Sequence, residues 1–154
     1  MIINIYGSTG KIGQKTLILI DKYFKNIKVN LICANNNFNL FIKQIEYYNP
    51  KYAYLNNPNY YEILKKRNFK KTKILTYKEL NNYLLNSKSD FSLLAISGYK
   101  SLYFLDSIVK NTKNLGILSK EAIVSAGHLF KKNKYFKKTK IFPLDSEHFS
   151  IFES

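Results

Sequence analysis

Residues 2–13 read IINIYGSTGKIG, and this stretch decides the fold. Residues 2–6 are a short apolar run of β-favouring side chains, after which Gly7, Gly10 and Gly13 recur at three-residue spacing. Apolar residues at helical spacing follow the last glycine. Glycines between a strand and a helix allow a tight turn whose backbone approaches a pyrophosphate, while the helix N-terminus supplies N–H groups and partial positive charge. We predict a dinucleotide-binding turn, and the alternative is a glycine-rich turn without a ligand.

The rest of the chain alternates between strand and helix patterns. Expected strands cover 28–33, 52–55, 73–75, 91–96, 115–118 and 140–144. A helix is expected after the glycine turn, where Thr16, Leu17, Ile20 and Phe24 recur at helical spacing. Further helices are expected over 38–48, 57–66, 77–85, 102–109 and 120–132. This alternation predicts an α/β fold, a Rossmann-like dinucleotide-binding domain with a mostly parallel sheet. Without a visible linker or repeat, residues 1–154 are expected to form a single domain.

The chain is strongly basic, with 25 Lys and Arg against 10 Asp and Glu and a formal net charge of +15. Such an excess is typical of nucleic-acid surfaces. Arg67 is the single arginine, however, and arginine is the residue best suited to bidentate contacts with bases and phosphates. Since the lysines are also spread along the chain, we favour a solvated surface over nucleic-acid binding, which stays the alternative.

The composition also bears on where the protein works. No apolar run reaches the roughly 18 residues that a membrane-spanning helix needs, and the start of the chain shows no signal peptide. Cys33 is the one cysteine, which rules out a disulfide framework and fits a reducing compartment. We therefore expect a protein of the cytoplasm, or of a plastid-like organelle, without a membrane partner.

The end of the second expected strand bears on the choice of nucleotide. A carboxylate at that place would hydrogen-bond the ribose 2′-hydroxyl of NAD, but here the chain has Asn35, Asn36 and Asn37. Nothing in this stretch repels a 2′-phosphate, so NADP is permitted, although no cation is present to bind it. The nearest basic candidate is Lys11 in the glycine turn, and its alternative role is that of a solvent-facing lysine.

Two carboxylates follow the last expected strand, at Asp145 and Glu147. In an extended chain, residues i and i+2 point the same way, so these two side chains would converge. Converging carboxylate oxygens suit a hard divalent cation, Mg²⁺ or Mn²⁺. Taken alone, the pair is weak evidence for a metal site, because acidic residues are also favoured at a helix N-terminus.

Four segments taken together resemble one enzyme family. They are GSTGKIG at 7–13, SKE at 119–121, AG at 126–127 and PLDSEHFSIF at 143–152. In this order they closely resemble 1-deoxy-D-xylulose 5-phosphate reductoisomerase along the whole chain. The resemblance implies an enzyme of the non-mevalonate isoprenoid pathway that uses NADPH and a divalent metal. It would rearrange and reduce the sugar phosphate 1-deoxy-D-xylulose 5-phosphate to 2-C-methyl-D-erythritol 4-phosphate.

The same resemblance assigns roles to individual residues. It implies a metal site at Asp145 and Glu147, a substrate site at Lys120, Ser146 and Glu147, and catalytic roles for Lys120 and Glu147. The cofactor-binding residues that it implies are Gly7, Thr9, Gly10, Lys11, Ile12, Gly13, Asn35, Asn36, Asn37, Ser119 and Glu121.

The sequence departs from the family pattern at several places. The three asparagines replace a segment with a cation, Ser119 replaces a longer asparagine, and residues 97–101 (SGYKS) are bulkier than the usual glycine- and alanine-rich stretch. Family members also continue beyond the carboxylates into a catalytic domain. We therefore expect the chain alone to bind nucleotide without turnover. Its expected protein partner is either a second copy, in a homodimer, or a separate chain that supplies the missing catalytic domain. The alternative is a basic binding module without catalysis.

Overall fold

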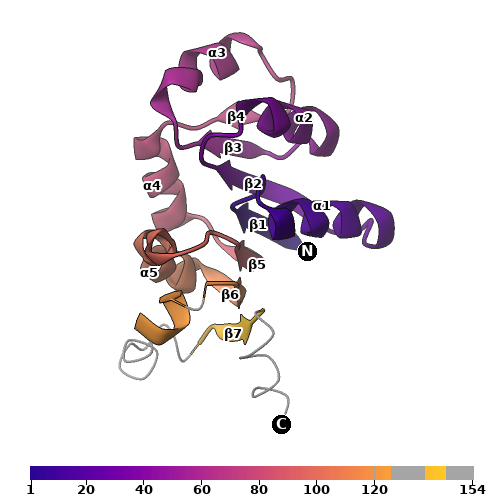
Figure 1. Cartoon of the computed structure of the whole chain (residues 1–154). Coiled ribbons are helices and arrows are strands. Elements are labelled where there is room, and N and C mark those ends of the chain that lie inside the picture. The colour runs from indigo at the N-terminus through magenta and orange to yellow at the C-terminus, as the bar shows by residue number, and fades with distance from the viewer. Residues whose placement is uncertain (120, 126–137, 145–154) are drawn as a thin grey trace.

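A computed structural model describes residues 1–119, 121–125 and 138–144. In this part of the chain one sheet has the strand order β4-β3-β2-β1-β5-β6-β7, and every pair of neighbours is parallel (Figure 1). The strands are β1 Ile2–Tyr6, β2 Lys28–Ala34, β3 Tyr52–Leu55, β4 Lys73–Ile74, β5 Ser89–Leu94, β6 Thr112–Ile117 and β7 Lys140–Pro143. The predicted Rossmann-like α/β fold is thus confirmed.

Helices cover both faces of this sheet. They are α1 Lys11–Tyr23, α2 Phe38–Tyr48, α3 Tyr61–Lys66, α4 Tyr77–Asn86 and α5 Leu102–Asn111, with short 3-10 helices η1 Pro58–Tyr60 and η2 Tyr99–Ser101. Residues 121–125 are helical too, and the rest of the helix expected over 120–132 lies outside the described residues. Helices α1, α2 and α3 bury apolar side chains in one core cluster, and α4 and α5 bury theirs in another, so the sheet separates two cores.

Two expected strands begin earlier in the structure than the sequence pattern indicates. The strand expected over 91–96 runs over Ser89–Leu94, and the strand expected from 115 begins at Thr112. Ser89, Ser92 and Thr112 are buried. The Ser89 hydroxyl bonds to the Ser92 hydroxyl within β5 and donates to the Thr112 hydroxyl on β6. Because these polar groups satisfy each other inside the protein, hydrophobic periodicity did not reveal the strand starts.

The predicted helix after the glycine turn is present, but its last expected apolar position is wrong. Leu17 and Ile20 are buried on α1, whereas Phe24 lies beyond the last turn as the C-cap and is 54% exposed.

Among the helices of the described residues, none combines the length and the apolar character needed to cross a membrane.

The order of the strands creates a switch point between β1 and β5. From β1 the chain builds the sheet outward in one direction through β2, β3 and β4, then returns to the other side of β1 as β5. The connections after β1 and β5 therefore leave in opposite directions. In open parallel sheets, this divergence opens a crevice at the carboxyl ends of the strands, where ligands bind.

Candidate dinucleotide-binding site

The glycine turn, residues 7–13, lies at this switch point. The backbone N–H of Ala95, just after β5, donates to the carbonyl of Tyr6 at 2.8 Å, which holds the two strand ends together. Gly7 has a φ of +92°, and a Cβ at this position would lie 2.5 Å from the Ala95 carbonyl oxygen. Both the backbone conformation and the available space therefore require glycine at position 7.

The other two glycines shape the entry into α1. A Cβ on Gly13 would lie 2.3 Å from the carbonyl oxygen of Gly7 and 2.7 Å from the Cα of Ser8, so only hydrogen fits. Gly10 is the N-cap and has an extended backbone, with φ −72° and ψ 163°. The carbonyl of Gly10 accepts a hydrogen bond from Gln14, and the N–H groups of residues 11–13 lack a carbonyl one turn earlier in the helix. Such N–H groups are suited to binding phosphate oxygens.

Two glutamines, Gln44 and Gln14, hold the turn in place, and neither was predicted from the sequence. Gln44 Nε2 donates to the carbonyl oxygen of Ser8 at 2.8 Å, and Ser8 Oγ donates to Gln44 Oε1 at 2.8 Å, with both residues buried. Gln14 Nε2 donates to the carbonyl oxygen of Thr9 at 2.9 Å. The sequence did contain a signal for Gln44, because this polar residue lies on the face of the 38–48 helix where Phe41 and Ile45 are buried.

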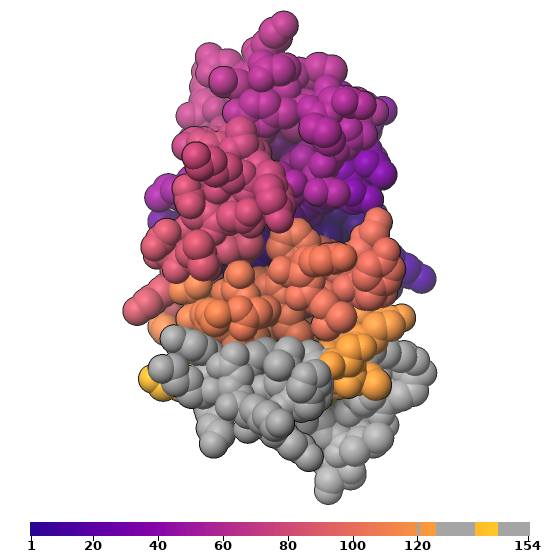
Figure 2. All heavy atoms as spheres, turned by 90° about the vertical axis from the view of Figure 1, so that its left-hand side faces the viewer, coloured from indigo at the N-terminus to yellow at the C-terminus, as the bar shows by residue number. Residues whose placement is uncertain are grey.

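The crevice is a cleft of about 600 Å³ at the carboxyl ends of the strands. This edge cleft is lined by Gly7, Thr9, Gly10, Cys33, Ala34, Asn35, Tyr54, Asn56, Tyr77, Ala95, Ile96, Ser97, Tyr99, Lys100, Tyr103 and Phe104. Figure 2 shows a hollow between the magenta-pink and coral segments, with indigo atoms of the N-terminal segment at its floor. Of the predicted cofactor residues, the cleft brings together Gly7, Thr9, Gly10 and Asn35.

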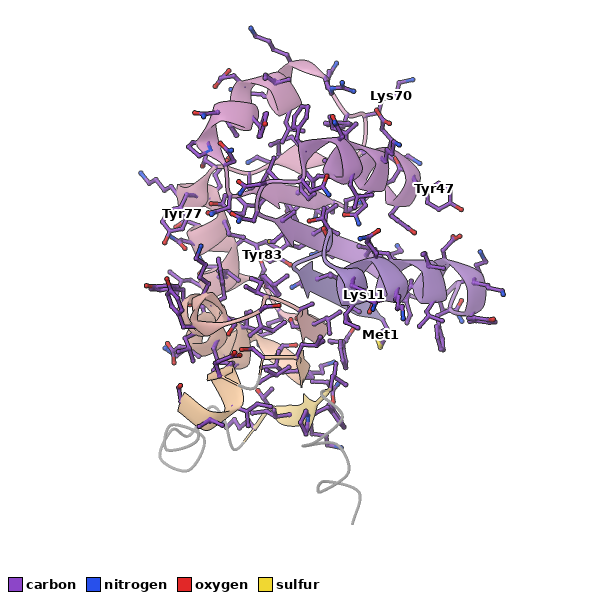
Figure 3. The ribbon with its side chains drawn as sticks, in the orientation of Figure 1. Met1, Lys11, Tyr47, Lys70, Tyr77 and Tyr83 are labelled. Atoms are coloured by element: carbon purple, nitrogen blue, oxygen red, sulfur yellow. The ribbon has the colours of Figure 1, made fainter. Side chains whose placement is uncertain are left out.

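The remaining predicted cofactor residues do not line this cleft. Lys11 and Ile12 are exposed in the first turn of α1, and Figure 3 shows Lys11 there, across the sheet from Tyr77 at the start of α4. Gly13 faces the glycine turn itself. The side chain of Asn37 caps α2 by accepting from the Leu40 N–H, and Asn36 is exposed.

Asn35 belongs to a polar chain at the ends of β2 and β3. Its Oδ1 accepts from Asn56 Nδ2 at 3.0 Å, and Asn56 Oδ1 accepts from the Tyr54 hydroxyl, also at 3.0 Å. Burial raises the pKa of Tyr54 to about 12, so its hydroxyl stays protonated and donates at neutral pH. Burial likewise raises the pKa of the Cys33 thiol, which lines the cleft as a neutral group.

Aromatic side chains form much of the cleft wall, a feature that was not predicted from the sequence. The rings are Tyr54, Tyr77, Tyr99, Tyr103 and Phe104. Tyr54 and Tyr77 come from β3 and α4, and their ring centroids are 6.5 Å apart. Aromatic faces of this kind stack well against a nucleobase.

Ser119 and Glu121 lie next to the loop that follows β5. Ser119 Oγ is 2.8 Å from Glu121 Oε2 and 3.2 Å from the carbonyl oxygen of Gly98. It also accepts a hydrogen bond from the backbone N–H of Ala122. Ser119 thus links the start of the helical residues 121–125 to the loop after β5 that contains Gly98. Lys120 lies outside the described residues.

The predicted metal ligands follow β7, which ends at the same edge of the sheet as β1. The Leu144 N–H donates to the Ile117 carbonyl oxygen at 2.8 Å, which extends the pairing with β6 by one residue. Asp145, Ser146 and Glu147 lie outside the described residues. Within the residues that are described, no group of three or more His, Cys, Asp or Glu side chains is placed to hold a metal ion.

The family is settled by comparison with known proteins. The family model described as 1-deoxy-D-xylulose 5-phosphate reductoisomerase matches residues 3–127. The chain belongs to this reductoisomerase family. A family member from Pelagibacter ubique (strain HTCC1062) is 38% identical over 152 residues, which cover 97% of this chain and 39% of the relative. Another, from Wigglesworthia glossinidia brevipalpis, is 35% identical over 157 residues, covering 99% and 40%.

Solved reductoisomerase structures share the fold described above. The enzyme from Zymomonas mobilis, in complex with NADPH, superposes with a TM-score of 0.86 at 27% identity, covering 99% of this chain and 40% of that one. A DOX-P reductoisomerase in complex with NADPH, fosmidomycin and magnesium gives a TM-score of 0.83 at 25% identity, covering 96% and 37%. The chain thus spans about two fifths of the length of the reductoisomerases it matches.

Proposed function

We propose that this chain is the NADPH-binding part of a 1-deoxy-D-xylulose 5-phosphate reductoisomerase. The observation that carries the proposal is the glycine turn at the switch point, where Gly7 and Gly13 approach other backbone so closely that no side chain fits. Such packing keeps the turn tight and leaves the N-terminus of α1 at the crevice. Family membership and the NADPH complex of the Zymomonas mobilis relative support the same function.

The residues of this chain would bind and orient the dinucleotide. The N–H groups at the start of α1 would hydrogen-bond the diphosphate, and Gln44 and Gln14 would keep the turn in its binding shape. The aromatic wall of the edge cleft would stack the adenine and shield it from water. When bound, NADPH would supply a hydride, and the residues named above would hold and orient the cofactor.

The rest of the reaction is proposed for the segments near β7. Asp145 and Glu147 are the proposed ligands of Mg²⁺ or Mn²⁺, which as a Lewis acid would polarise substrate oxygens. Lys120, Ser146 and Glu147 are proposed to contact the sugar phosphate substrate, and Ser119 and Glu121 to lie beside the nicotinamide. The end of β7 at the same sheet edge as β1 supports this arrangement.

The remaining proposals concern assembly and location. We propose that the chain forms a homodimer or associates with a separate chain that carries the catalytic domain, and that residues 1–154 form one nucleotide-binding domain. A reducing compartment, the cytoplasm or a plastid-like organelle, agrees with the buried, unpaired thiol of Cys33.

Binding of NADPH to the whole chain tests the function, and Gly10 provides a sharp variant. Asp is a favoured N-cap residue, so the Gly10→Asp chain should still fold, while the variant places a negative charge beside the diphosphate. Gly10→Asn is the matched control, because it adds the same bulk at the same N-cap without the charge. A Cβ at Gly10 would lie 3.3 Å from the Gly7 carbonyl oxygen in both variants.

The readout is a fluorescence titration with NADPH, with melting curves as the check on folding. Saturable binding by the unmodified chain is expected, and Gly10→Asp should weaken it at least about tenfold more than Gly10→Asn does. The proposal fails if the unmodified chain shows no saturable binding, or if the Asp and Asn variants bind equally well.

A further inference from the structure

The part of the edge cleft at the end of β2, where the adenosine of a dinucleotide is expected, lacks a positively charged side chain. Asn35, Asn36 and Asn37 follow β2, and none of them carries a charge. Two of the three are already engaged, since Asn35 Oδ1 accepts from Asn56 and Asn37 Oδ1 caps α2. A dianionic 2′-phosphate therefore finds no positive partner in this segment.

One charged side chain does line the cleft. Among the described residues that form its wall, Lys100 alone carries a charge, and the others are glycine, aliphatic, amide, thiol, hydroxyl or aromatic residues. Lys100 is exposed and takes part in none of the ion pairs found among the described residues. Its ammonium group therefore remains available to an anion that enters the cleft.

The backbone around Lys100 is held firmly at the cleft. Gly98 has a φ of +72° and turns the chain from β5 into η2. Its carbonyl oxygen lies 2.7 Å from the hydroxyl of Ser101, which is buried, and 3.2 Å from the hydroxyl of Ser119. These contacts fix the base of the lysine, while its long side chain stays free to adjust to a ligand.

Lys11, the basic residue nearest the glycine turn, is less well placed for the adenosine. It lies in the first turn of α1, outside the residues that line the cleft. Asn35, Asn56 and Tyr77, from the β2, β3 and α4 side, line the same cleft as Lys100. An adenosine bound between these residues and η2 would share the cleft with Lys100. The diphosphate would lie at the glycine turn, whose N–H groups can bind it without a side-chain cation.

We propose that Lys100 binds the 2′-phosphate of NADPH and so sets the preference for NADPH over NADH. This inference rests on the proposed function, because it requires a dinucleotide in the edge cleft. A lysine ammonium is a compact point charge that pairs well with phosphate, and NADH offers no phosphate at the 2′ position. The contact should therefore strengthen the binding of one cofactor only.

The experiment compares NADPH and NADH in fluorescence titrations of the full chain. Lys100→Ala should raise the Kd for NADPH about tenfold and leave the Kd for NADH within about twofold. Lys100→Arg keeps the charge and should restore most of the preference. Lys78→Ala removes an exposed lysine from the neighbouring α4, outside the cleft, and should change neither constant.

Melting curves of each variant establish that folding is intact. The inference is overturned if Lys100→Ala leaves NADPH binding unchanged. It is also overturned if the variant weakens the binding of NADPH and of NADH equally, because Lys100 would then contact the diphosphate that both cofactors share. It is likewise overturned if the unmodified chain binds both cofactors without preferring NADPH. Absence of binding to either cofactor would instead remove the proposed function itself.

Discussion

Gln44 and Ser8 are joined by two hydrogen bonds of 2.8 Å, although 36 residues separate them in the chain. One of these bonds holds the backbone carbonyl of Ser8 and the other its hydroxyl. Both residues are buried, with exposures of 4% and 0%, so neither partner has ready access to water. Through this pair, α2 fixes the conformation of the glycine turn that starts α1.

Removing the carboxamide should therefore loosen the turn. Gln44→Leu keeps similar bulk but leaves the Ser8 groups without a partner, and we expect a loss of about 1–3 kcal/mol in the free energy of unfolding. Urea unfolding measures that loss, and an NADPH titration should show weaker binding of the folded variant. Lys43→Ala, a change at an exposed neighbour on the same helix, should affect neither. Equal stability of Gln44→Leu and the unmodified chain would contradict this role.

Adding a methyl group at Gly13 should destabilise the protein despite the good helix propensity of alanine. The new Cβ would meet backbone atoms of Gly7 and Ser8, which cannot move without opening the turn. We expect Gly13→Ala to lower the free energy of unfolding by about 1–3 kcal/mol or more.

Gly116→Ala provides the steric contrast for this change. There the nearest atoms are the far ends of the Leu144 and Phe91 side chains, which can rotate away. Its loss of stability in urea unfolding should be the smaller of the two. A Gly13→Ala variant as stable as the unmodified chain would show that the turn is not closely packed.

Stability should fall at alkaline pH because several buried groups favour their protonated forms. Burial raises the pKa of Tyr54 to about 12, and it raises the pKa values of Cys33 and Tyr83 above their ordinary values of 9.0 and 10.0. The stability that these groups contribute is fully present below the ordinary values and is lost as the pH rises through the raised ones.

The test is the urea midpoint at about pH 8 and about pH 11, which should fall between the two. Cys33→Ala removes one of the titrating groups and should reduce the size of that fall. A midpoint that stays constant over this range would refute the expected pH dependence.

Much of the fold could be predicted from the sequence because its signals are local. The strand over 52–55 and the helix over 38–48 appear with the predicted bounds, since apolar periodicity and the flanking Asn and Pro residues mark both. The glycine turn between β1 and α1 was also predicted, since its three glycines lie within seven residues. The starts of β5 and β6 were missed because Ser89 and Thr112 are satisfied by partners that only the folded sheet supplies.

In the candidate site too, residues close together in the sequence could be predicted, whereas residues brought together by the fold could not. Gly7, Thr9 and Gly10, which the sequence predicts as cofactor-binding residues, line the cleft, and each belongs to the strand–turn–helix motif. Tyr77 and Lys100 were not predicted, because they reach the cleft from α4 and η2, which the sheet brings to the switch point. Asn37 was expected at the cofactor, whereas in the structure its side chain caps α2.

The amino-acid order by itself determined the α/β class, the glycine turn and the family, because each depends on residues that are close together or occur in a fixed succession. Only the tertiary structure decided that Gln44 holds the turn and that Lys100 shares the cleft with Asn35 and Tyr77. The physical reason is that strand order places segments side by side irrespective of their separation along the chain. Such contacts leave no periodic trace in the sequence.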